Sequence, residues 1–194
     1  MTQISYDYFI ALPMSGISDD FRQQLKTQLE AIQGLLASCG KTLYCAELTL
    51  KTPGQFDTPL DSYRMDIDAL KVAKNFLLIW PHATPSGALI ELGMAIEKGM
   101  PITVLQAEGV HLPWMCRAWG TLEDQGQFLI RNYGALGDIL RLVSEDVLPK
   151  EAQRLEAAVR RFSGAASDGP SPNSPVGCQP GAQQGAPPPQ PRLY

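Results

Sequence analysis

The chain has 194 residues, of which 44% are hydrophobic, and its formal net charge is −4. The length fits one ordinary domain with a remainder, and the apolar content is sufficient for a buried core. An acidic balance without a Lys/Arg run argues against a nucleic-acid partner, because affinity for a phosphate backbone comes from clustered basic side chains. We therefore expect small-molecule ligands.

Cysteine, histidine and N-terminal patterns exclude several other classes of protein. The four cysteines form no CxxC pair, and the two histidines, His82 and His111, are far apart, so neither a zinc site nor a redox motif is visible. We expect no metal and no cofactor. Residues 1–7 lack the pattern of a signal peptide, and no run of about 18 apolar residues occurs. The sequence thus predicts a cytoplasmic protein without a membrane span.

Short apolar runs alternate with amphipathic segments through the first 163 residues. The runs are about five residues long and rich in Ile, Leu, Val or Phe, which is typical of strands covered on both faces. They lie at 8–12, 42–46, 76–80 and 102–105, and a further short run lies at 128–130. Apolar residues recur at helical spacing in 19–39, 62–74 and 87–98, and two closing helices are predicted at 136–147 and 151–162. This order predicts an α/β fold with a doubly wound, flavodoxin-like parallel sheet of four to five strands and helices on both faces.

The composition changes abruptly at Gly164. Pro, Gly, Ser, Ala and Gln dominate from there on, half of the protein's 16 prolines lie there, and apolar periodicity ends. The sequence therefore predicts an α/β domain over 1–163 and a disordered Pro/Gly-rich tail over 164–194. A polyproline ligand at 187–189 is the alternative for part of the tail, although a charged flanking PxxP pattern is missing.

The turn after the first strand is a candidate ligand site, because an open parallel sheet binds ligands beyond the carboxyl ends of its strands. Ser15 and Gly16 precede a helix that Ser18 opens, so a hydroxyl and backbone N–H groups are available for a phosphate or a sugar hydroxyl. The turn is neither a Walker nor a Rossmann loop. A plain capped helix start is the alternative interpretation.

After the third strand, Glu91 lies near the start of a helix with apolar neighbours on both sides. A helix N-terminus favours the ionised carboxylate, and an ionised, partly buried carboxylate suits a nucleophile. In the preceding predicted helix, Asp66 and Asp68 cannot share a face, because two residues are about 200° apart around the axis. Asp66 lies on the apolar side, so we expect it to face the cleft, and we keep Asp68 as a candidate substrate contact. A solvated surface face with a helix cap is the alternative for all three carboxylates.

Several segments in this region resemble the nucleoside 2-deoxyribosyltransferase superfamily, which includes N-glycosidases of nucleoside 5'-monophosphates. They are MDIDALK at 65–71, the apolar run at 76–80, SGALIELGMA at 86–95 and KGMPI at 98–102. The similarity covers about residues 5–145, and its motifs are short but well placed. By position, Glu91 matches the family's nucleophile, and Asp66 matches the Asp that contacts and helps to protonate the departing base.

The resemblance also implies how the rest of the substrate is held. Ser86 and Gly87 fall where relatives hold the sugar 5' position. Transferases usually offer an Asp to a 5'-hydroxyl there, whereas phosphate-preferring relatives use a Ser together with a Ser/Gly turn after the first strand. This chain has no Asp at that point, which favours a nucleotide gripped by Ser15, Gly16, Ser86 and Gly87.

Two further positions follow from the same resemblance. Phe9 corresponds to the family's Tyr on the first strand and is a candidate substrate contact, with Tyr6 and Tyr8 nearby but out of register. Trp119 and Gly120 resemble a Trp-Gly in a loop that reaches the neighbouring subunit's site in relatives. The resemblance therefore implies a homo-oligomer, a dimer or larger.

The functional hypothesis is cleavage of the N-glycosidic bond of a nucleoside or nucleoside 5'-monophosphate, by hydrolysis or base transfer. Two alternatives remain open at the level of the sequence. One is a TIR-like NAD glycohydrolase, which also sets a helix-borne Glu against a ribosyl C1'. The other is a nucleotide-binding sensor that has kept the fold without turnover.

Overall fold

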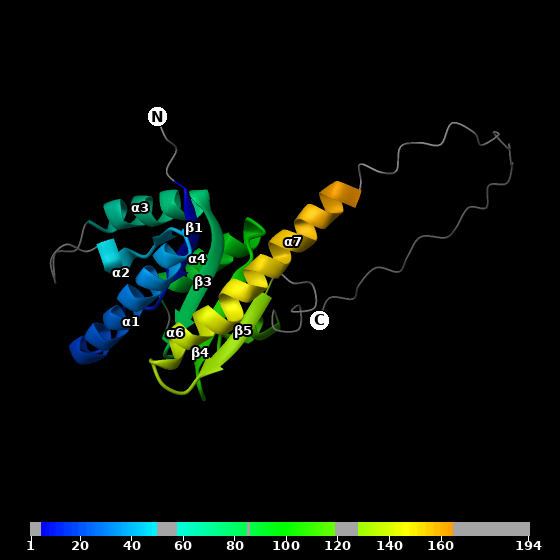
Figure 1. The fold of residues 1–194 in the computed structure, drawn as a ribbon. Helices are drawn as coiled ribbons and strands as arrows, with labels where there is room; N and C mark the ends of the chain where they lie inside the picture. The colour runs from blue at the N-terminus through cyan, green and yellow to red at the C-terminus, as the bar shows by residue number, and fades with distance from the viewer. Residues whose placement is uncertain (1–4, 50–57, 85, 119–127, 165–194) are drawn as a thin grey trace, which may run out of the picture. The chain divides into compact units, whose positions relative to one another are not determined.

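Five parallel strands form the sheet of the protein (Figure 1). The computed structural model describes residues 5–49, 58–84, 86–118 and 128–164. The strands are β1 (Tyr6–Ala11), β2 (Leu43–Tyr44), β3 (Ala73–Trp80), β4 (Ile102–Ala107) and β5 (Phe128–Tyr133). They lie in the order β2-β1-β3-β4-β5, and every neighbouring pair is parallel. The predicted α/β fold is confirmed, and the run at 128–130 belongs to the fifth strand.

Helices connect the strands and close the chain. They are α1 (Asp19–Ser38), α2 (Ala46–Thr49), α3 (Pro59–Val72), α4 (Gly87–Glu97), α5 (Trp114–Arg117), α6 (Asp138–Leu142), the π-helical turn η2 (Val143–Val147) and α7 (Leu148–Gly164). The closing helices predicted at 136–147 and 151–162 correspond to α6 with η2 and to α7, but the predicted gap between them is missing because the three elements follow one another without a break. Pro149 would clash with the carbonyl four residues earlier in an α-helix, and the wider π turn before it accommodates the ring.

The junction between α3 and β3 also differs from the prediction. The sequence predicts a helix to residue 74 and a strand from 76, whereas α3 ends at Val72 and β3 begins at Ala73. The Lys98 ammonium donates hydrogen bonds to the carbonyl oxygens of Leu70, Lys71 and Ala73, at 2.9, 2.7 and 2.9 Å. These bonds satisfy carbonyls that a helix end leaves unpaired, so the helix passes into the strand without a loop.

Helices cover both faces of the sheet, as its strand pattern predicts. On one face, α3 and α4 bury Ala69, Leu70, Ala88, Leu92 and Ala95 against Phe9, Phe76 and Leu78. On the other face, α1, α6 and η2 pack against Tyr8, Ile10, Leu77 and Ile79. The residues of α1 with helical apolar spacing, Leu25, Leu29, Ile32 and Leu36, are all buried there. Strand alternation therefore places Tyr8 and Phe9 on opposite faces.

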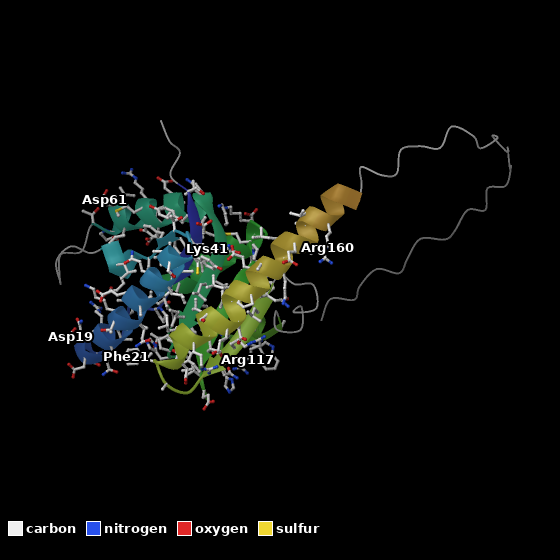
Figure 2. All side chains as sticks on the ribbon, viewed as in Figure 1. Asp19, Phe21, Lys41, Asp61, Arg117 and Arg160 are labelled. Atoms are coloured by element: carbon white, nitrogen blue, oxygen red, sulfur yellow. The ribbon has the colours of Figure 1, made fainter. Side chains whose placement is uncertain are left out.

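A buried carboxylate, Glu151, stabilises the start of α7 against the strands. The Tyr8 hydroxyl donates to Glu151 at 2.6 Å, and the Lys41 ammonium forms an ion pair with it at 2.8 Å. Asn75 on β3 donates a third hydrogen bond at 3.4 Å. Lys41 is labelled in Figure 2, beside the α7 ribbon. These bonds commit Tyr8 to the face of the sheet that α1 covers, so its hydroxyl is not available on the face of Phe9.

The chain divides into two compact units, Met1–Glu156 and Ala157–Tyr194. All of the candidate site residues belong to the first unit. The tail predicted for 164–194 lies, beyond Gly164, outside the described residues. Within the described part of the chain, none of the helices combines the length and the apolarity that crossing a membrane requires.

Candidate active site

A cavity of about 170 Å³ opens at the carboxyl ends of the central strands. Its lining comes from β1 and the turn that follows it, from α2, from α3 and from the first turns of α4. Of the predicted site residues, the cavity brings together Phe9, Ser15, Asp66, Ser86, Gly87 and Glu91. The two catalytic candidates therefore line the same cavity although they belong to different helices.

Glu91 lies in the second turn of α4 and is partly buried. Burial, together with the negative charge of Asp66, raises the pKa of Glu91 to about 7 from a usual value of 4.5. The two effects oppose the stabilisation of the ionised form that the helix N-terminus supplies. At neutral pH comparable fractions of Glu91 are therefore ionised and protonated. The sequence, by contrast, predicts an ionised Glu91.

Asp66 on α3 is half-buried and is held by an aromatic hydroxyl. Burial raises the pKa of Asp66, and the hydrogen bond that it accepts from the Tyr44 hydroxyl, 2.8 Å long, lowers it in part. Two coupled carboxyl groups in one cavity do not ionise independently, because a charge on one disfavours a charge on the other. The arrangement favours one carboxylate and one carboxylic acid. Because the negative charge of Asp66 is a cause of the raised pKa of Glu91, and the Tyr44 hydroxyl stabilises ionised Asp66, the free protein favours a protonated Glu91 beside an ionised Asp66.

Tyr44 is a site residue that sequence reasoning missed. It pairs with Phe9 across the β1–β2 register, and the two rings stack with centroids 5.4 Å apart. Phe9 stacks on its other side against Phe76 at 5.7 Å and is almost wholly buried. Phe9 therefore forms part of the cavity floor, while Tyr44 supplies the hydroxyl. The sequence gives no signal for this pairing, because the register of Tyr44 against Phe9 is known only once β1 and β2 are seen side by side.

The two Ser/Gly turns lie beside one another. Gly16 has a positive φ of 78°, which a residue with a side chain rarely adopts, and a Cβ there would lie 3.8 Å from the methyl group of Thr84. Gly16 thus shapes the turn without lining the cavity. Ser86 is the N-cap residue of α4, but its hydroxyl makes no capping bond and is buried without a hydrogen-bond partner among the residues that the structure describes. That hydroxyl remains free to bind a ligand in the cavity.

The structure does not bring Asp68 to the cavity, contrary to expectation. Its side chain is 73% exposed and forms an ion pair with Lys71 at 2.9 Å. Asp66 and Asp68 point to different sides of α3, as the 200° argument requires, and only Asp66 faces the ligand side. Trp119 and Gly120 lie outside the described residues, so the homo-oligomer that they imply stays a prediction.

A second missed residue, Glu47, lies in α2 directly after β2. It lines the same cavity and is 7% exposed, and within the described ranges one of its carboxylate oxygens, Oε2, has no hydrogen-bond partner. Burial raises the pKa of Glu47, while the charges of Arg22 and Lys26 on α1 lower it. In the sequence, a Glu after a two-residue strand gives no sign that it is buried.

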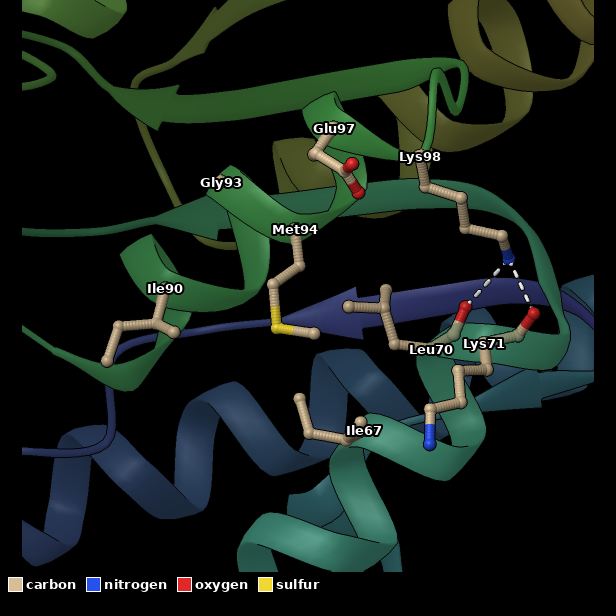
Figure 3. A pocket seen from close by; sticks show the side chains of 8 residues that line it. All are labelled: Ile67, Leu70, Lys71, Ile90, Gly93, Met94, Glu97 and Lys98. Carbon is tan, nitrogen blue, oxygen red and sulfur yellow. Dashed lines mark hydrogen bonds between the residues drawn. The ribbon is translucent and has the colours of Figure 1, made fainter.

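A larger groove of about 530 Å³ lies between α3 and α4. Figure 3 shows Ile67, Leu70 and Met94 directed into it, with the Lys98 ammonium bonded to backbone carbonyls at one end. The acidic residue in its lining is Glu97, and neither Glu91 nor Asp66 contributes. This groove is the larger of the two, but the paired carboxyl groups line the smaller cavity, which is therefore the candidate site. Among the described residues, no group of three or more His, Cys, Asp or Glu side chains is arranged to hold a metal ion.

The raised pKa of Glu91 predicts that stability falls as the pH rises from about 4.5 to about 7. In this window the unfolded chain loses the Glu91 proton while the folded protein keeps it, so a higher pH favours unfolding. The full effect is roughly 3 kcal/mol, reached above the folded pKa. The free energy of unfolding is measured with urea at several pH values for wild type and Glu91→Gln. We expect it to fall with rising pH in the wild type by this amount more than in the variant. Equal pH slopes in the two proteins would contradict the assignment.

Comparison with known proteins adds information on the fold. No family model matches the sequence, and no curated protein matches it. Among solved structures, the chain is similar to the CMP N-glycosidase BcmB of Clostridium botulinum, with 21% identity, a TM-score of 0.51, and coverage of 71% of this chain and 97% of that one. It also matches the TIR domain of the Toll-related receptor TRR-2 of Hydra magnipapillata, with 14% identity, a TM-score of 0.40, and coverage of 80% and 99%. The first likeness shows a shared fold, and the second is too weak to carry an argument.

Proposed function

We propose that the protein cleaves the N-glycosidic bond of a nucleoside 5'-monophosphate, with Glu91 as the nucleophile and Asp66 as the acid. The observation that carries this proposal is the pair of coupled carboxyl groups in one cavity at the carboxyl edge of the sheet. The fold shared with an enzyme described as a CMP N-glycosidase supports the proposal.

In the first step, a Glu91 carboxylate oxygen forms a bond to C1' while the bond from C1' to the base nitrogen breaks. The reaction requires the proton that the pair shares to lie on Asp66 and the charge on Glu91, the reverse of the state that the free protein favours, so nucleotide binding must move this proton. The electron pair of the broken bond goes to the base, and Asp66 donates the proton to it, directly or through a water. Tyr44 positions Asp66 for this transfer through its 2.8 Å hydrogen bond. This division of labour between two carboxyl groups parallels that of a retaining glycosidase.

In the second step, an acceptor attacks C1' and releases Glu91. Water as the acceptor gives the free sugar 5-phosphate, and the proton of the attacking water passes to the now ionised Asp66. A second base as the acceptor gives base exchange. The same carboxyl pair serves both outcomes, so the acceptor alone separates a hydrolase from a transferase.

The test is a product screen of the full chain against nucleosides, their 5'-monophosphates and NAD. We expect chromatography to show release of a free base from a 5'-monophosphate. Release of nicotinamide from NAD alone would instead support the TIR-like alternative. Tight nucleotide binding without any product after long incubation would support a sensor.

We further propose that Ser15, Ser86 and Gly87 bind the 5'-phosphate, while Gly16, which does not line the cavity, gives the turn its shape. The free Ser86 hydroxyl and the N-terminus of α4 supply donors, because backbone N–H groups at a helix start attract anions. Among the residues that line the cavity, no carboxylate comes from either Ser/Gly turn.

This phosphate site predicts a change of preference in Ser86→Asp. The new carboxylate repels a dianion and removes a donor, but it still accepts a hydrogen bond from a 5'-hydroxyl. We expect kcat/KM for a 5'-monophosphate, divided by that for its nucleoside, to exceed one in wild type and to fall by about a hundredfold or more in the variant. Ser86→Ala separates the loss of the hydroxyl from the added charge. A wild-type ratio below one, or no change in Ser86→Asp, would show that free nucleosides are the substrates.

A further inference from the structure

Glu47 lines the same cavity as Asp66, the proposed acid, and Glu91, the proposed nucleophile. Asp66 must reach the departing base, and the bond from Tyr44 to Asp66 ties this part of α3 to the end of β2. Glu47 follows Tyr44 by three residues, in α2. The proposed phosphate contacts come from the start of α4 and the turn after β1, whereas Glu47 comes from α2, so the cavity offers Glu47 as a polar group in addition to those turns.

Burial of the Glu47 carboxylate costs free energy unless a ligand donates a hydrogen bond to it. More than nine-tenths of the residue is shielded from solvent, and Oε2 accepts no hydrogen bond from any residue that the structure describes. Arg22 and Lys26 are near enough to favour its charge, but neither forms an ion pair with it within the described part of the chain. Arg22 donates instead to the carbonyl oxygen of Met14 at 3.4 Å. A buried polar atom without a partner in the protein suggests a partner in the ligand.

We infer that Glu47 selects nucleotides whose base carries an exocyclic amino group, by accepting a hydrogen bond from that group. An ionised carboxylate only accepts hydrogen bonds, so it pairs with the amine of cytosine or adenine. The carbonyl oxygen of uracil or hypoxanthine in the same place would face the carboxylate oxygen and leave both without a donor. Sites that bury such a group reject the unmatched analogue strongly, because the buried group is left unpaired. This inference rests on the proposed function.

The test compares two pairs of substrates that differ in the amino and keto groups: CMP with UMP, and AMP with IMP. We expect wild-type kcat/KM to favour the amino member of at least one pair by about a hundredfold or more. Glu47→Gln offers both a donor and an acceptor, so the ratio should move towards one by at least about tenfold. Glu97→Gln makes the same chemical change on the exposed side of α4 and should leave the ratio unchanged.

Binding measurements separate this inference from the proposed function. The same nucleotides are titrated by calorimetry against Glu91→Gln, and against wild type if the wild type has no turnover. Preferential binding of the amino member, lost on a further Glu47→Gln change, supports the role of Glu47 even in a chain that cleaves nothing. Cleavage of both members at equal rates, a preference for the keto member, or a ratio unmoved by Glu47→Gln overturns the inference while leaving the proposed function intact. No binding of any of the four nucleotides overturns both.

Discussion

Glu91→Gln is expected to abolish cleavage of the N-glycosidic bond while the protein stays folded and still binds nucleotide. The amide is nearly the same size as the acid, but it is a poor nucleophile and forms no stable glycosyl intermediate. Loss of about 4 kcal/mol of barrier stabilisation corresponds to about a thousandfold in rate. We therefore expect kcat to fall by at least this factor, measured as release of free base from the best substrate of the product screen.

Glu97→Gln is the matched control for this variant. Glu97 lies on the same helix, but it is exposed and does not line the cavity of Glu91. The control should retain wild-type kcat, and calorimetry should show nucleotide binding to both variants. A decrease of less than about tenfold in Glu91→Gln would be too small for the loss of a nucleophile and would remove Glu91 from that role.

The sequence predicts the architecture well because each apolar run and each amphipathic segment reports local burial. The run at 76–80 lies within β3, and the helix predicted at 87–98 is α4 almost residue for residue. The end of α3 could not be predicted in this way. It depends on Lys98, whose ammonium binds carbonyls about 25 residues earlier in the chain, and local periodicity carries no information on such a contact.

Some residues of the candidate site can likewise be predicted from local sequence patterns, and others cannot. Glu91 and Asp66 stand out in the sequence because each is a carboxylate in an apolar helical pattern, and the cavity brings them together. Tyr44 and Glu47 do not stand out, because β2 has two residues and α2 has four, too few for a periodic pattern. Their contribution arises from strand register and from burial by other elements. For Asp68 the prediction fails in the opposite way. The sequence suggests a substrate contact, but Asp68 is two residues from Asp66 and therefore lies on the opposite, solvent side of α3.

Asp66→Asn is expected to slow cleavage of the natural nucleotide by about 10² to 10⁴, the range typical of a lost general acid. The asparagine side chain still accepts the hydrogen bond from Tyr44, so the packing of α3 should survive. Asp68→Asn is the matched control, because this neighbour carries the same functional group on the exposed side of the helix. We expect the control to keep wild-type kcat/KM within about twofold, as surface changes of this kind usually have small effects.

A change of leaving group tests whether Asp66 acts as the acid. A purine or pyrimidine base departs more readily when it is protonated, whereas 4-nitrophenolate departs without a proton. If Asp66 is the acid, the defect of Asp66→Asn should be large with the nucleotide and small with 4-nitrophenyl ribofuranoside 5-phosphate, because only the first reaction uses its proton. The nucleophile acts on both substrates, so Glu91→Gln should be equally defective with both. An equal loss in Asp66→Asn for the two leaving groups would mean that Asp66 orients the sugar or controls the charge of Glu91, and the acid would have to be sought elsewhere in the cavity.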